Sequence, residues 1–344
     1  MLPRIIEKAD MDKLLGELLK RHRVAAPVAK DGRFVFKEVS NPAEVRLDYT
    51  ISVLPPKKFL MPQWDSVLRA RLRGEKQELK AFVEPEPIVI FGMHPCDLTA
   101  TWLLDVVFAE GEQDPHYTER RKSAFIVGLD CLKPCDQYQF CLDMGSLFPQ
   151  GNFDLFLTDI GESYFVEIGS ERGYRLLEEC FALARTATNQ DFVARQNAEQ
   201  QKRKNFSHKL PFDVKYLPEI LDASYDSLIW QAVARKCFSC GTCNVVCPTC
   251  YCFDVHDELD LSLSEVDRRR RWDSCQLDSF AKVAGGESFR HDRSERLRHR
   301  FFRKGKYLLE MYGRRGCVGC GRCDRECVAK ISSVETYRQI AGSR

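Results

Sequence analysis

The sequence lacks any apolar run that approaches the ~18 residues of a membrane-spanning helix. Its N-terminal segment places Asp10, Asp12 and Glu17 within its apolar pattern, whereas a secretory signal peptide has an uninterrupted apolar stretch. A large charge of one sign is also missing, because 52 lysines and arginines face 50 aspartates and glutamates. A general polyanion-binding protein is usually strongly basic. We therefore expect a cytoplasmic protein with no membrane span and no nucleic-acid partner.

Cysteine is absent from residues 1–95, although the whole chain has 16 cysteines. Four of them lie between residues 96 and 141, one is Cys180, and the others lie between residues 237 and 327. The cytosol keeps thiols reduced, and reduced thiols at short fixed spacings usually bind metal. The uneven distribution also predicts two domains, over residues 1–208 and residues 209–344.

The alternation of β-rich and helical patterns in the first part predicts an α/β (or α+β) N-terminal domain with helices on a mixed or parallel sheet. Strands are expected at residues 33–37, 49–54, 87–92, 124–128, 153–157 and 164–168. Helices are expected at residues 5–20, 97–108 and 171–185. The second part has few β-type runs and many helix formers, so we expect a mostly α-helical, ferredoxin-type domain there.

Two cysteine motifs with identical spacing lie in the second part: Cys237-x2-Cys240-x2-Cys243-x3-Cys247 and Cys317-x2-Cys320-x2-Cys323-x3-Cys327. Each matches the bacterial ferredoxin run for a [4Fe–4S] cluster, in which the fourth cysteine ligates the other cluster. We therefore predict two [4Fe–4S] clusters with crossed ligation. One is held by Cys237, Cys240, Cys243 and Cys327, and the other by Cys317, Cys320, Cys323 and Cys247. Structural zinc is the alternative, but zinc sites usually use single CxxC pairs.

Three glycines lie inside these motifs, namely Gly241, Gly319 and Gly321. A glycine allows the backbone to approach another group closely, so we expect these residues to let the backbone approach the sulfides of the clusters. Residues 248–316 separate the two motifs, a distance much longer than in a small ferredoxin. This insertion indicates two cluster-binding halves separated by helices.

Several longer strings resemble a known family: CPTCYCFDV at 247–255, RRWDSCQ at 270–276, AGGESFR at 284–290, PPKKF at 55–59 and FGMHPCD at 91–97. They are similar to the β-subunits of cytoplasmic sulfhydrogenase-type [NiFe] hydrogenases, and equally to the A subunit of anaerobic sulfite reductase. The resemblance extends over almost the whole chain, from about residue 24 to residue 330. The combination of these strings is much more specific than the ferredoxin motifs alone.

The resemblance implies an iron–sulfur electron-transfer subunit that has no catalytic residue of its own. Its implied partners are a flavin (FAD) reductase subunit that binds NAD(P) and a catalytic subunit, either a [NiFe] hydrogenase or a sirohaem sulfite reductase. A relay linked to a heterodisulfide reductase is an alternative within the same class. An iron–sulfur protein that binds nucleic acid is an alternative of another class, because residues 268–271 and 298–306 are rich in arginine and lysine.

Four further cysteines are candidates for a third metal site. Cys96 follows the expected strand at 87–92, while Cys131 and Cys135 follow the expected strand at 124–128, and Cys141 lies six residues further on. The ends of parallel strands form the usual ligand-binding edge of an open sheet. These thiolates could bind a third [4Fe–4S] cluster; a mononuclear zinc site and a set of buried thiols are the alternatives.

The remaining cysteines have no motif of their own. Cys250 and Cys252 lie beside the first motif, and we favour packing or hydrogen bonding to cluster sulfides over a role as ligands. Cys180 lies in an apolar helical stretch and is expected in the core. The sequence leaves the role of Cys275 open.

Overall fold

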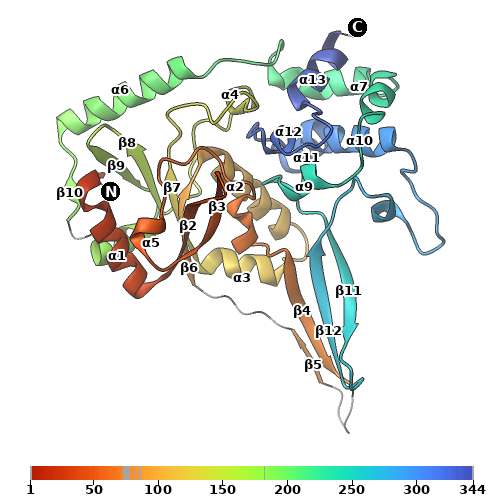
Figure 1. Cartoon of the computed structure of the whole chain (residues 1–344), viewed down its shortest axis with the longest axis horizontal. Coiled ribbons are helices and arrows are strands. Elements are labelled where there is room, and N and C mark those ends of the chain that lie inside the picture. Colours follow the sequence, from red (N-terminus) through yellow and green to blue (C-terminus); the bar gives the residue numbers. More distant parts are fainter. Residues whose placement is uncertain are drawn as a thin grey trace.

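A central eight-stranded sheet organises the N-terminal part of the computed structural model, which describes residues 2–72, 78–81, 83, 85, 87–181 and 183–342 (Figure 1). The strand order is β10-β1-β9-β8-β7-β6-β2-β3, and the four neighbours β8, β7, β6 and β2 are parallel. The strands are β1 (Arg4–Glu7), β2 (Arg23–Lys30), β3 (Arg33–Val39), β6 (Ile88–Met93), β7 (Ala124–Leu129), β8 (Leu155–Asp159), β9 (Ser163–Ile168) and β10 (Arg185–Thr186). The expected α/β character of this part is therefore present.

The centre of this sheet is buried because its strands are apolar on both faces. Every residue of β6 is buried, as is typical of a parallel strand covered on both sides. The accompanying helices are α1 (Met11–Arg21), α2 (Pro95–Ala109), α3 (Pro115–Ser123), α4 (Cys141–Met144), α5 (Glu171–Cys180) and α6 (Asn189–Asn205). Helix α1 buries Met11, Leu14, Leu15 and Leu18, which share one face at helical spacing.

Two local predictions in this part are wrong. Residues 5–20 do not form one helix, because Ile5 and Ile6 are buried in β1, which pairs with β9, and α1 begins only at Met11. Residues 49–54 do not form a strand; Ser52 makes an isolated bridge to Phe34. In both places the conformation depends on pairing with a distant part of the chain, and the local sequence pattern carries no information about that pairing.

A second sheet joins two distant parts of the chain and projects from the body of the molecule (Figure 1). It is antiparallel throughout, in the order β11-β12-β4-β5. We call it the arm; its strands are β4 (Trp64–Arg71), β5 (Glu78–Ala81), β11 (Phe253–Leu259) and β12 (Glu265–Trp272). The mostly α-helical second part is therefore not confirmed, because β11 and β12 interrupt it. The domain boundary at residues 208 and 209 stays a prediction.

Short helices surround the two cysteine motifs in the C-terminal part. They are α7 (Leu217–Ala223), α8 (Ile229–Ala234), α9 (Thr242–Val245), α10 (Arg293–Phe302), α11 (Leu308–Tyr312), α12 (Arg322–Arg325) and α13 (Ser333–Gly342). Trp230, Phe301, Phe302 and Tyr337 form the centre of a separate apolar core between these helices. This core supports the loops that carry the cysteines. No helix in the described part of the chain is long and apolar enough to cross a membrane.

Candidate metal centres

The two cysteine motifs have the same backbone conformation. Ser239 and Gly319 have φ of 53° and 63°, while Gly241 and Gly321 have φ of 79° and 74°. A short helix follows in each motif, α9 in the first and α12 in the second, and these two helices contact each other. The amide nitrogen of Ser239 lies 3.3 Å from the sulfur of Cys237, and that of Gly319 lies 3.4 Å from the sulfur of Cys317. The molecule thus contains two equivalent cysteine loops that face one another.

Gly319 and Gly321 allow the second cysteine loop to pack closely against residues 138–141. A Cβ atom on Gly319 would lie 2.5 Å from the backbone oxygen of Phe140, and one on Gly321 would lie 2.7 Å from the carbonyl carbon of Tyr138. The expectation that the backbone at these glycines approaches cluster sulfides stays a prediction, and the structure adds a second requirement for Gly319 and Gly321. Their role is to let the second loop pack on residues 138–141, and they combine positive φ with close approach.

Two cavities group the motif cysteines across the motifs. The first cavity is lined by Cys237, Cys240, Cys243, Cys323 and Cys327. The second is lined by Cys247, Cys317, Cys320 and Cys323. Each cavity therefore contains the first three cysteines of one motif and the fourth cysteine of the other. This is the grouping that crossed ligation requires.

Buried cations test whether these cavities fit anionic clusters. Arg300 in α10 is 7% exposed and lines both cavities, and its Nε donates a 3.3 Å hydrogen bond to Oδ1 of Asn244. No carboxylate of the described residues forms an ion pair with Arg300. Burial alone would lower the pKa of Arg300, but the thiolates of Cys243, Cys323 and Cys247 raise it well above its ordinary value. Since a buried cation needs an anionic partner, the residues present fit two thiolate-bound clusters.

The four N-terminal cysteines lie together at the carboxyl ends of β6 and β7. Cys96 is in the first turn of α2, Cys131 and Cys135 are in the loop after β7, and Cys141 begins α4. Cys96 and Cys135 pack with Cys320 in one apolar group, while Cys131 packs with Cys141 in another. The thiol of Cys131 also hydrogen-bonds to Cys135, which lowers the pKa of Cys135. The structure thus brings the predicted third site together and places it beside the second cavity.

His94 borders this group of cysteines and packs against an aromatic ring. Its ring is fully buried and stacks on Tyr49 with the ring centroids 4.0 Å apart. Burial lowers the pKa of His94 to about 3, so the ring is neutral at physiological pH. Within the described residues, no group of three His, Cys, Asp or Glu side chains could hold a single metal ion. The ligands of an iron–sulfur cluster can lie further apart than the ligands of a single ion, because the thiolates bind different irons of the cluster.

A buried ion pair fastens the N-terminal site to the second motif. Arg322, in α12 between two motif cysteines, makes a bidentate pair with Asp97, with N–O distances of 2.7 and 2.8 Å. Arg322 Nε also donates to the carbonyl oxygen of Ser52 at 2.9 Å. The amide nitrogen of Phe140 donates to the carbonyl oxygen of Gly319 at 2.7 Å. These contacts hold the N-terminal cysteines in a fixed position relative to the second cysteine loop.

Sequence reasoning missed the residues that lie between the sites. Arg300 was visible only as part of the basic stretch 298–306, Asp97 only as part of the string FGMHPCD, and Arg322 was not singled out. A usable signal was present for Arg322, because it lies between Cys320 and Cys323. No sequence signal marks Arg300, since its position depends on how α10 packs between the two cavities.

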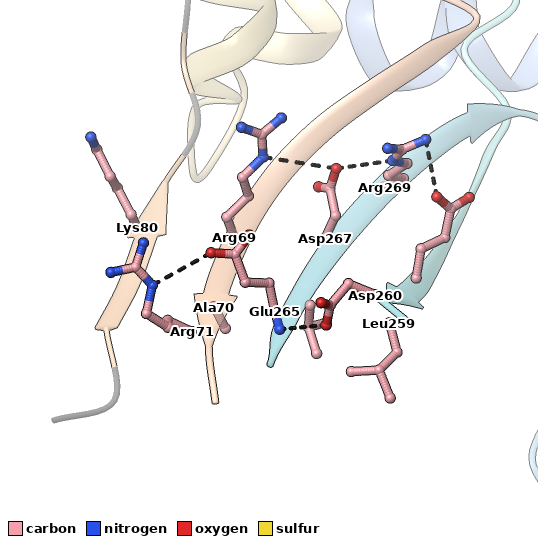
Figure 2. Close-up of a pocket in the computed structure, with 11 residues that line it drawn as sticks. Arg69, Ala70, Arg71, Lys80, Leu259, Asp260, Glu265, Asp267 and Arg269 are labelled. Carbon is pink, nitrogen blue, oxygen red and sulfur yellow. Dashed lines mark hydrogen bonds and ion pairs between the residues drawn. The ribbon is translucent and has the colours of Figure 1, made fainter. Parts of the chain in front are cut away.

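The arginine run at 268–271 is paired with acidic residues. It lies on β12 of the arm, and not on a helix as its composition indicated. Each arginine contacts a carboxylate: Arg268 with Asp257 at 2.7 Å, Arg269 with Asp267 at 3.0 Å, Arg270 with Asp65 at 2.8 Å and Arg271 with Asp254 at 3.0 Å. Figure 2 shows the pocket near the tip of the arm, where Arg69 and Arg269 share Asp267 and Arg71 pairs with Glu265. These arginines therefore stabilise the arm and do not form an unbalanced basic stripe for nucleic acid.

Comparison with known proteins agrees with this geometry. The family described as a 4Fe-4S dicluster domain matches residues 236–331, the segment that contains both cysteine loops and the whole of β11 and β12. The chain is 36% identical to sulfhydrogenase 2 subunit beta of Pyrococcus furiosus over 318 residues, which cover 92% of each chain. The aligned region spans the segment that holds the N-terminal cysteines as well as the dicluster segment. The chain therefore belongs to the family of sulfhydrogenase β-subunits.

Proposed function

We propose that this chain is the electron-transfer subunit of a cytoplasmic [NiFe] hydrogenase complex. It would connect a flavin (FAD) subunit that reacts with NAD(P)H to the catalytic subunit that handles hydrogen. Family membership and the dicluster domain support this role. All sixteen cysteines are free thiols, which agrees with a reducing cytoplasm.

The observation that carries the proposal is the pair of cavities on either side of Arg300. We assign one [4Fe–4S] cluster to Cys237, Cys240, Cys243 and Cys327, and the other to Cys317, Cys320, Cys323 and Cys247. When bound, such clusters each take up and release one electron. Arg300 balances the negative charge of both sites, and the amides of Ser239 and Gly319 donate hydrogen bonds to ligand sulfurs. Charge and hydrogen bonds of this kind set the reduction potentials.

The four N-terminal cysteines extend this arrangement. We propose that Cys96, Cys131, Cys135 and Cys141 bind a third [4Fe–4S] cluster. The proposal is supported by the apolar group in which Cys96 and Cys135 pack with Cys320, a proposed ligand of the second cluster. The three sites would then form one chain through the molecule. Cys240 is exposed, so the first cluster would lie nearest to solvent and to a redox partner.

The test is anaerobic affinity purification of the tagged protein from its native cells, followed by mass spectrometry and iron analysis. Co-elution of a flavin reductase subunit and a [NiFe] hydrogenase subunit is the expected result. Co-elution of a sirohaem subunit in place of the hydrogenase would assign the chain to sulfite reduction. Recovery of the chain without any redox partner would reject the proposed complex. The double variant Cys131→Ala/Cys135→Ala tests the third cluster: loss of about four irons per chain would support it, whereas an unchanged iron content would reject it.

A further inference from the structure

Three cysteines outside the ferredoxin motifs meet at the base of the arm. Phe253, the first residue of β11, pairs with Trp272, the last residue of β12. The pairing continues beyond the strands, because the amide nitrogen of Asp273 donates to the carbonyl oxygen of Cys252 at 3.0 Å. This register brings Cys250 and Cys252, which precede β11, close to Cys275, which follows β12. Cys250 is 6% exposed, Cys275 is 3% exposed and Cys252 is half-buried.

The three sulfurs form one polar cluster. Interactions with the sulfurs of Cys250 and Cys275 raise the pKa of the Cys252 thiol. The sulfur of Cys275 also accepts hydrogen bonds from Nδ2 of Asn244 at 3.0 Å and from Nε2 of Gln276 at 3.8 Å. N–H donors directed at a sulfur favour the thiolate over the thiol. They are also the kind of contact that surrounds ligand sulfurs in iron–sulfur sites.

Two buried lysines lie next to these three cysteines. Lys57 is 3% exposed, its Nζ donates to the carbonyl oxygen of Cys250, and the same Nζ lies 4.3 Å from the centroid of the Trp272 ring. Lys304 is also buried, and its Nζ donates to Oγ1 of Thr249 at 2.8 Å. No carboxylate of the described residues pairs with either lysine. A negative charge on these cysteines would compensate the buried ammonium group of Lys57, whereas Lys304 also lines the second cavity and faces Cys247.

We propose that Cys250, Cys252 and Cys275 bind an iron–sulfur cluster of their own, next to the site that contains Cys247. Three protein thiolates suit a three-iron cluster, or a four-iron cluster whose remaining iron takes a ligand from outside the chain. Lys57 lies against this site and balances its charge, while Lys304 lies between it and Cys247. The inference rests on the cysteine and lysine geometry and is independent of which catalytic subunit the chain serves.

The test compares the iron content and the EPR spectra of anaerobically purified full-length variants. The double variant Cys250→Ala/Cys275→Ala should lose the iron of one cluster, about three or four atoms per chain, and one EPR signal of the reduced or oxidised protein. Cys180→Ala is the matched control, because Cys180 is a buried cysteine in α5 far from the cysteine loops in sequence. It should keep the iron content of the unsubstituted chain.

A second variant keeps the test decisive if the double variant fails to fold. Lys57→Met keeps an apolar stem against Trp272 but removes the buried charge. It should retain all iron and shift one EPR-detected midpoint potential to a lower value. Unchanged iron and EPR signals in the cysteine variant, or unchanged potentials in Lys57→Met, would overturn the proposal. Loss of zinc in place of iron would overturn it as well.

Discussion

At the scale of residues, a buried arginine without a carboxylate partner distinguishes the cysteine sites from ordinary core packing. Most buried arginines in this molecule have carboxylate partners, as Arg270 has Asp65 and Arg322 has Asp97. Arg300 instead faces Cys243, Cys247 and Cys323. A cation placed near a cluster favours the reduced form, because reduction adds negative charge.

Arg300→Gln should therefore lower the reduction potentials of both proposed ferredoxin-type clusters. At an effective dielectric constant near 20, removal of one unit charge a few ångströms from a cluster corresponds to a decrease on the order of 100 mV. The measurement is an anaerobic redox titration followed by EPR. Arg298→Gln is the control, because Arg298 lies on the same helix but stacks on Tyr225 with a distance of 3.9 Å to the ring centroid. Equal potentials in both variants would contradict the assigned role.

Crossed ligation makes a prediction that depends on a single cysteine. Cys327→Ala should destabilise the cluster of Cys237, Cys240 and Cys243, because Cys327 lies in the cavity of the first motif. The cluster of Cys317, Cys320 and Cys323 should remain. The reciprocal variant Cys247→Ala should have the opposite effect, and EPR spectroscopy of the two reduced variants separates the signals. If each variant instead lost the cluster bound by the other three cysteines of its own motif, ligation would not be crossed.

At the scale of elements, the contact between the second cysteine loop and residues 138–141 depends on glycine. Gly321→Ala should destabilise the protein by about 2 kcal/mol or more, because positive φ and a close backbone contact act together. Gly313→Ala is the matched control, since Gly313 has φ of 65° and no atom within 4 Å of an added Cβ. The difference in unfolding free energy between the two variants measures the contact. Equal unfolding free energies in the two variants would mean that the second cysteine loop can move away from residues 138–141 without a loss of stability.

The elements that the sequence predicts best are those with a strong local pattern of apolar residues. Helix α2 and strands β6, β7 and β8 were expected within a few residues of their true bounds, because long apolar runs and helical spacing mark them. The cysteine loops were predicted for a similar reason, since their spacing is local. The arm was not predicted, because the charged residues of β12 become regular only when they pair with β4 and β11.

At the scale of the whole molecule, one buried ion pair connects the N-terminal sheet to the second cysteine loop. Asp97→Asn should destabilise the protein by about 3–5 kcal/mol, because it leaves Arg322 buried without a full negative partner. Anaerobic denaturation in guanidinium gives the unfolding free energy. The double variant Asp97→Asn/Arg322→Met should recover part of the loss, since the uncompensated charge is then gone. A mild effect of the single variant would indicate that water reaches the pair.

The arm has a consequence for how the protein is made. Asp65 in β4 and Arg270 in β12 are separated by 205 residues but form a buried ion pair. During synthesis on the ribosome, β4 and β5 therefore emerge long before the strands that complete their sheet. An exposed hairpin edge invites pairing with other chains, and sheets built from distant segments form slowly. Protection of this edge on the nascent chain, for example by a chaperone, should consequently raise the yield of soluble protein when the gene is overexpressed.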